Sequence, residues 1–520
     1  MLKRFLLLIT VIFIAVQIPA QVKINSVYND YFDYLALSDQ TVNPVLMYHS
    51  FSNNRWNPGD DHIWSKGLNI NGILFDSQSY RLKLISPELI LSGNTAYDRS
   101  ELSDGSWWQG RGLNGFFSTG LKFESKYFEL TLLPEIWFSQ NLYYDIIASA
   151  VDSEYGYFFS LIDLPQRMGN DPVFKFNWGQ TDIRLNWKNL TLGFSNENIL
   201  WGPSRVNSLL MSDNASGFPH IDFGLRKTPT RLGDFEVYAI RGMVSESDFY
   251  DTDENNNNTF ISGLTSGYSP ALIPGLTLGF KWTLMTDWEN WEKSWQLQFL
   301  GYDYTNHYFG GDQMDMKGSL TLDWVFPEVG FEWYFEYFRE DYSPSLRFIL
   351  LAPGHAAGWT LGGQKAFPLS DKKGIRATLE WNELIQSRDY EIDLGAGGIY
   401  YTHSRVPHGF TNLGQLLGAG IGGGSDAETF LLDYYDSWGK AGLMLQRIGW
   451  NKMYLYKTPV SGDYLKLNVE MNLGFNGTLF LNDNFSLIGN MILSYNLNYN
   501  YVENNDVINL YASLGLEYGL

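Results

Sequence analysis

The sequence contains no cysteine in its 520 residues, so disulfide bonds and thiolate metal sites are excluded. Cationic residues are also scarce, with 36 Lys and Arg against 57 Asp and Glu and a formal net charge of −21. Nucleic-acid binding is driven by clustered cations on a protein surface. The acidic balance therefore excludes nucleic acid as a partner.

Long apolar runs are absent after the first 20 residues, since no later segment reaches the roughly 18 apolar residues of a membrane-spanning helix. The start of the chain differs. Lys3 and Arg4 precede an apolar stretch from Phe5 to about Val16, and the small residue Ala20 follows. This pattern is typical of a secretory signal peptide, with an uncleaved anchor as the alternative. We expect residues 1–20 to be the signal peptide and the protein to be exported.

Local catalytic and metal motifs are missing as well. The sequence has no HExxH or GxSxG motif, and His403 and His408 are its closest histidine pair. Gly418, Gly420 and Gly423 have GxGxxG spacing, but no helical pattern follows, which favours a tightly turned backbone over nucleotide binding. We expect no catalytic residue, no metal site and no cofactor. A hydrolase whose residues meet across strands stays open as an alternative.

Aromatic residues are abundant, at 16% of the chain, and period-two alternation dominates after about residue 70. Apolar residues alternate with polar or small ones over 465–475, 485–499 and 510–520. These segments exceed the ~5–6 residues of ordinary strands, and aromatic rings suit the headgroup boundary of a membrane. The pattern predicts an all-β fold, a transmembrane antiparallel β-barrel over residues 71–520. A secreted β-solenoid or β-sandwich is the alternative.

The connections between alternating segments predict the topology. Asn482 to Asn484 is expected to be a tight periplasmic turn, and Asn500 to Asp506 an outer loop, because bacterial barrels have short turns on the periplasmic side. Allowing roughly 25–28 residues per strand and its connections, the chain has room for about 16–18 strands, and the number should be even. We favour 18 strands.

Residues 21–70 follow a different period. Tyr28, Tyr31, Tyr34 and Leu35 recur at helical spacing before the turn-like Ser38 and Asp39. This predicts a short amphipathic helix. With the barrel closed behind it, the segment is expected at the periplasmic mouth, as a plug.

The stretch from Leu190 to Gly224 is the most distinctive of the sequence. It contains Trp201-Gly202-Pro203, Leu209-Leu210, Ser212, Asn214-Ala215 and Pro219. With these residues, and with Gly409 to Asp426 and Tyr31 to Asp39, the sequence resembles the Wzi family of capsule-assembly outer-membrane proteins. That family is characterised by an 18-stranded outer-membrane barrel with a periplasmic helical plug, acting as a lectin that holds capsular polysaccharide to the cell surface. The resemblance implies the same fold and role here and brings no catalytic residue. A departure is the region before residue 70, which is short for a plug and has one clear helix.

Candidate glycan-binding residues are tryptophans and arginines, because flat rings stack on sugar faces and guanidinium groups bind anionic sugars. Two alternatives stay open. The tryptophans are equally suited to an aromatic girdle at the membrane surface. The block from Trp201 to Pro219, with turn chemistry at Gly202 and Pro203, can also fold inward and pair Arg205 with a carboxylate in the lumen. The candidates are Trp107, Trp108, Arg111, Trp201, Arg205, Trp288 and Trp291.

Together these features predict a non-catalytic outer-membrane lectin. Its expected partners are capsular or other surface polysaccharide, outer-membrane lipid and other envelope proteins. The alternative function is a porin-like channel for small solutes, because a barrel of this size can enclose an aqueous pore. What fills the lumen decides between the two.

Overall fold

Eighteen antiparallel strands form the wall of the protein. The computed structural model describes residues 20–24, 26–59, 61–65, 72–99, 103–251, 257–290, 314–340, 346–386, 400–404, 406–457 and 464–519. The last strand, β27 (Val507–Tyr518), pairs with β26 (Phe485–Leu497) on one side and β5 (Tyr80–Asn94) on the other, so the sheet closes into a barrel. The predicted fold class and strand number are confirmed.

Two of the eighteen wall strands are interrupted. One is made of β7 and β8, which both pair with β6. The next is made of β9, which pairs with β8, and β10, which pairs with β7. The remaining wall strands are continuous. Before β27 the wall runs through β5, β6 (Gly112–Ser125), β7 (Phe128–Leu132), β8 (Glu135–Ser139), β9 (Val173–Asn177), β10 (Asp182–Trp187), β11 (Leu190–Ser195), β13 (His220–Thr230), β14 (Gly233–Ser245), β15 (Asn258–Pro270), β16 (Leu276–Asp287), β17 (Asp315–Phe326), β18 (Phe331–Arg339), β19 (Ala357–Ser370), β20 (Lys373–Glu383), β23 (Asp426–Asp436), β24 (Gly439–Gly449), β25 (Val469–Asn482) and β26.

Shorter elements lie inside the barrel or at its rims. Each has a few residues, apart from the α2 helix. They are α2 (Val27–Leu37), α4 (Leu346–Leu351), α5 (Met453–Lys457), the 3-10 turns η1 (Trp288–Asn290), η2 (Pro327–Val329), η4 (Tyr464–Lys466) and η5 (Tyr499–Tyr501), and the strands β1 (Ala20–Gln21), β2 (Tyr48–His49), β3 (Arg55–Trp56), β4 (Ile73–Asp76), β12 (Leu200–Trp201), β21 (Thr411–Asn412) and β22 (Gln415–Leu416).

The alternation of side chains sets the two faces of the wall. On β18, Phe331 and Phe335 are exposed on the outside, whereas Glu332, Tyr334 and Glu336 are buried inside. Several charges facing the lumen form ion pairs, which offset the cost of burying them: Lys281 lies 2.9 Å from Glu336. An apolar outer belt on a closed barrel with a polar interior is the architecture of an outer-membrane protein. The protein resides in the outer membrane.

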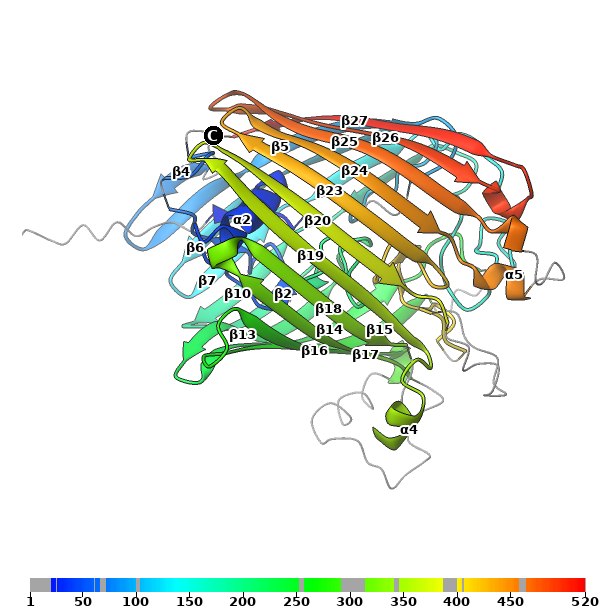
Figure 1. Ribbon diagram of the computed structural model, residues 1–520, viewed down its shortest axis with the longest axis horizontal. Coiled ribbons are helices and arrows are strands. Elements are labelled where there is room, and N and C mark those ends of the chain that lie inside the picture. The colour runs from blue at the N-terminus through cyan, green and yellow to red at the C-terminus, as the bar shows by residue number, and fades with distance from the viewer. Residues whose placement is uncertain are drawn as a thin grey trace, which may run out of the picture.

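The two ends of the barrel differ, as Figure 1 shows. The end that holds the chain's C-terminus has tight turns, and at one of them the Asn482 side-chain oxygen accepts the backbone N–H groups of Asn484 and Phe485, at 2.8 and 3.0 Å. The turn predicted there is confirmed. Long connections gather at the opposite end, beside α4 and α5 (Figure 1). We refer to the two ends as the periplasmic and the outer end.

One strand boundary predicted from the alternation is wrong. Leu465 and Leu467 were expected to begin a strand, but Leu465 lies in η4 and β25 starts only at Val469. The amide of Asn498 donates to the carbonyl oxygens of Leu465 and Leu467, at 2.9 and 3.0 Å. At the outer rim, the Asn498 side chain therefore supplies hydrogen bonds that a neighbouring strand would supply to residues within the sheet.

The N-terminal segment lies within the periplasmic end of the barrel, where Figure 1 shows α2 enclosed by strands. Ser26 caps α2 by accepting the N–H of Asn29. Its aromatic face packs on the wall: the Tyr34 ring stacks on Tyr435 of β23, with ring centroids 4.7 Å apart. The predicted helix is confirmed. Among the described residues, none of the helices has the length and hydropathy to cross a membrane.

Candidate functional site

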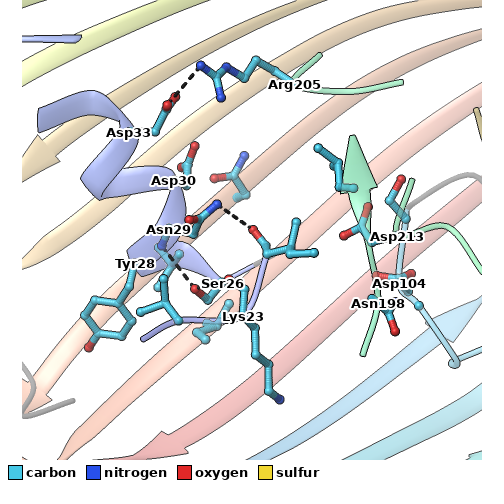
Figure 2. A pocket seen from close by; sticks show the side chains of 18 of the residues that line it. Lys23, Ser26, Tyr28, Asn29, Asp30, Asp33, Asp104, Asn198, Arg205 and Asp213 are labelled. Carbon is cyan, nitrogen blue, oxygen red and sulfur yellow. Dashed lines mark hydrogen bonds and ion pairs between the residues drawn. The ribbon is translucent and has the colours of Figure 1, made fainter. Parts of the chain in front are cut away.

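A cavity of about 660 Å³ lies in the lumen beside the N-terminal segment. Four parts of the chain line it: the segment around α2, the connection between β5 and β6, the connection between β11 and β13, and the inner face of the wall. Figure 2 shows Asp30 and Asp33 on α2 facing Arg205, while Asp104, Asn198 and Asp213 lie across the cavity. The plug segment and folded-in loops therefore occupy much of the lumen.

Ion pairs attach α2 to the wall. Asp30 contacts Arg376 of β20 and lies 2.5 Å from the Lys440 ammonium of β24. Burial alone would raise the pKa of Asp30, but Arg376 and Lys440 outweigh it and hold the pKa below its usual range. The helix is thereby fixed to neighbouring strands.

Further contacts of the N-terminal segment reach other sides of the barrel. Glu236 of β14 accepts the backbone N–H groups of residues 46–48 at 2.7–3.1 Å. Arg55 lies 2.5 Å from Glu129 of β7, and Lys23 lies 2.9 Å from Glu88 of β5. Anchors on strands so far apart in the barrel hold the segment across the lumen.

Arg205 lies inside the barrel and is paired with carboxylates. Its guanidinium is 3.0 Å from Asp33 and 2.9 Å from Glu332 of β18. The surrounding block folds inward, because β12 pairs with β2 of the plug segment and Trp201 is fully buried. Of the two arrangements weighed for Arg205, the structure has the pairing with lumenal carboxylates.

The other sequence candidates lie far apart. Trp107 and Trp108 are buried inside the barrel against Phe116, Trp137 and Met168, so the girdle placement considered for them is wrong. Their loop turns into the lumen, where Ser106 donates to Glu135 at 2.7 Å. Arg111 donates to the carbonyl oxygens of Thr95 and Tyr143, Trp288 is 45% exposed beside Phe260, and Trp291 lies outside the described residues.

A second pocket, of about 190 Å³, lies among the long connections at the outer end. It is smaller than the roughly 300–1,000 Å³ of sites that enclose drug-sized ligands. Four aromatic side chains that line it are only partly buried, which leaves ring surface accessible: Tyr157, Phe158, Trp450 and Tyr499. Of the sequence candidates, Trp108 also lines this pocket.

Four asparagines of this outer pocket have buried side-chain oxygens with no hydrogen-bond partner within the described parts of the chain. Three of their amide nitrogens are already engaged: Asn214 donates to the Leu416 carbonyl, Asn451 to the Tyr157 hydroxyl, and Asn496 to Glu470. A buried acceptor without a partner costs about 1–3 kcal/mol, so these oxygens are suited to hydroxyl donors from a ligand or water. The four are Asn214, Asn451, Asn468 and Asn496.

Sequence reasoning missed this pocket almost entirely. Asn214 belongs to the stretch that carries the family resemblance, and the alternation places Asn468 and Asn496 on a polar strand face. The outer pocket is formed by the path of the loops over the outer end, and no local sequence pattern predicts that path.

The remaining motifs have structural surroundings. The glycine-rich stretch at 418–424 is followed by strand β23 and not by a helix. His408 is buried, and its Nδ1 lies 3.0 Å from the Thr259 hydroxyl. No group of three or more His, Cys, Asp or Glu suited to a metal ion occurs within the described residues.

Comparison with known proteins yields a fold and no family. No family model matches the sequence, and no curated protein does. Among solved structures, the chain is similar to Wzi of Escherichia coli, an outer-membrane protein involved in group 1 capsule assembly and a carbohydrate-binding β-barrel. The TM-score is 0.55 at 11% identity, over 84% of this chain and 85% of that one.

Two Occ proteins give lower scores. OccAB2 of Acinetobacter baumannii has a TM-score of 0.41 at 12% identity, over 83% of this chain and 97% of that one. OccK5 of Pseudomonas aeruginosa has a TM-score of 0.40 at 10% identity, over 85% and 98%. At such identities the likeness to Wzi concerns the barrel fold alone.

Proposed function

We propose that the protein is a non-catalytic outer-membrane lectin that binds surface polysaccharide, including capsular polysaccharide, and helps to attach or assemble it at the cell surface. The observation that carries the proposal is the outer pocket, where accessible aromatic rings lie beside unpartnered amide oxygens. Rings that stack on sugar faces and acceptors for sugar hydroxyls are the two contacts that hold a glycan.

Two further features support the proposal. The plug segment and inward loops occupy the lumen, which fits a binding protein better than an open pore. The fold is similar to that of Wzi, which is itself a carbohydrate-binding barrel. Of the residues expected from sequence to bind glycan, Trp108 lines the outer pocket and is retained in the proposed site. Outer-membrane lipid surrounds the barrel, and other envelope proteins are proposed as further partners.

Titration of the purified protein with polysaccharide from its own cell surface tests the proposal. Trp450→Ala should weaken binding by roughly 2- to 12-fold, since an aromatic contact contributes ~0.5–1.5 kcal/mol. Trp438→Ala is the matched control, because Trp438 is 40% exposed in the β23–β24 turn at the periplasmic end. Equal affinity of both variants and the unmodified protein would contradict the assignment of the pocket.

A channel for small solutes is the second candidate function. The observation in its favour is the 660 Å³ cavity within the lumen, lined by side chains of both charges. Such a cavity becomes part of a pore if the N-terminal segment leaves the barrel.

A further inference from the structure

The outer pocket offers unpartnered hydrogen-bond acceptors. The unpartnered groups of its asparagines are carboxamide oxygens, and each of these side chains is at least nine-tenths buried. Its other polar lining includes the carboxylates of Asp98, Asp145 and Glu470. A ligand that satisfies this lining must bring donors, as a sugar with free hydroxyl groups does.

The charges of the pocket have one sign. Among the described residues, its lining contains three carboxylates and no lysine, arginine or histidine. Glu470 is partly balanced from behind, because Arg99 lies 3.4 Å away and is itself fully buried. Arg167 is also engaged, with its guanidinium 4.8 Å from the centre of the Tyr143 ring and bonded to the Tyr144 carbonyl. Neither arginine lines the pocket.

A carboxylated sugar would therefore meet like charge in the described part of the pocket, where no cation is placed to bind it. Asp145 is exposed at the pocket, and its side chain accepts the hydroxyl of Tyr143 at 3.0 Å. The net charge of −21 adds a long-range repulsion that also acts against a polyanion. The charges of the pocket and the net charge of the protein therefore both disfavour the binding of a carboxylated sugar.

We propose that the outer pocket selects an uncharged, hydroxyl-rich sugar unit and rejects uronate units, a selectivity that rests on the proposed lectin function. Its volume of about 190 Å³ limits the bound part to a single unit or a chain end. A surface polysaccharide bound here is then either neutral or presents a neutral unit to the pocket.

A pair of probes that differ only in charge tests the selection. Oligogalacturonate and its carboxyl-reduced counterpart share chain length and linkage, and a panel of other neutral oligosaccharides extends the comparison. With the purified full-length barrel at low salt, the reduced probe should bind at least about tenfold more tightly than the uronate, and added salt should narrow the gap. Tighter binding of the uronate would overturn the inference, as would failure of every neutral oligosaccharide to bind at millimolar concentration.

A charge variant assigns the effect to the pocket. Asp145→Asn should strengthen uronate binding by roughly three- to tenfold and so narrow the difference in affinity between the uronate and its reduced counterpart. Asp152→Asn is the control, because Asp152 is an exposed acid of the same loop that does not line the pocket. Equal uronate affinity in Asp145→Asn and the unmodified protein would count against the charge argument. If the cell's own polysaccharide still binds through Trp450, the lectin function stands while the selectivity falls.

Discussion

At the scale of single residues, docking of the N-terminal plug segment in the barrel depends on buried side chains that can be accommodated in only one protonation state. His49 is a case in point, since it pairs with the inward block through β2 and is 8% exposed. Burial, with Arg205 and Lys281 nearby, lowers the pKa of His49 to about 3. The docked segment therefore requires a neutral imidazole.

The direction of the pH dependence follows from that lowered pKa. A released His49 takes up a proton near pH 6.5, whereas the docked one stays neutral down to about pH 3. The stabilisation is thus present above pH 6.5 and is lost as the pH falls towards 3. At pH 4.5 docking should be weakened by up to about 100-fold through this residue. Bilayer conductance should show more frequent openings at pH 4.5 than at pH 7.5.

His49→Gln is the matching variant, because glutamine cannot gain a proton in this range. Its openings should depend less on pH than those of the unmodified protein. If the two proteins respond to pH equally, His49 does not control docking and the acidic groups around Asp33 are the better candidates.

The position of a residue in the structure could be predicted from the sequence where a local pattern determines that position. It could not be predicted where the path of a loop determines it. The inward pairing of Arg205 follows from a cation in a Gly- and Pro-rich block of an acidic chain. The lumenal position of Trp107 and Trp108 did not follow, because tandem tryptophans suit a girdle and an interior equally well. Only the path of their loop places them against Trp137.

At the scale of elements, β27 closes the barrel. It pairs with β26 along its length and with β5 from Tyr511 to Glu517. Without it both neighbours would present unpaired backbone groups to lipid, at several kcal/mol for each group. Truncation from Leu510 should therefore abolish assembly, measured as loss of the heat-modifiable band in outer-membrane fractions. A truncated protein that still assembled would show that β27 does not close the wall.

Most wall strands and the α2 helix could be predicted from the periodicity of the sequence. Alternation marks the wall strands because one face meets lipid and the other the lumen, and the 3.6-residue spacing of Tyr28, Tyr31 and Leu35 marks α2. The inward block was harder, since its only regular element is the two-residue β12. Its shape depends on partners such as Tyr48 and Glu380, which are remote in sequence.

At the scale of the whole molecule, the filled lumen predicts little or no steady conductance. A barrel of about 18 strands is wide enough to conduct when it is empty. Removal of residues 22–65 should produce conductance in planar bilayers. Arg205→Ala is a milder variant that leaves Asp33 and Glu332 without this cation, and it should give transient openings. Large, stable openings of the intact protein would make transport the leading function.

The central claim is that the protein holds polysaccharide at the cell surface, and the most direct measurement is the distribution of that polysaccharide in a deletion strain. Total synthesis should stay unchanged, while the cell-attached fraction falls and the shed fraction rises. The unmodified gene should restore attachment, and Trp450→Ala should restore it only in part. Unchanged attachment in the deletion strain would contradict the account.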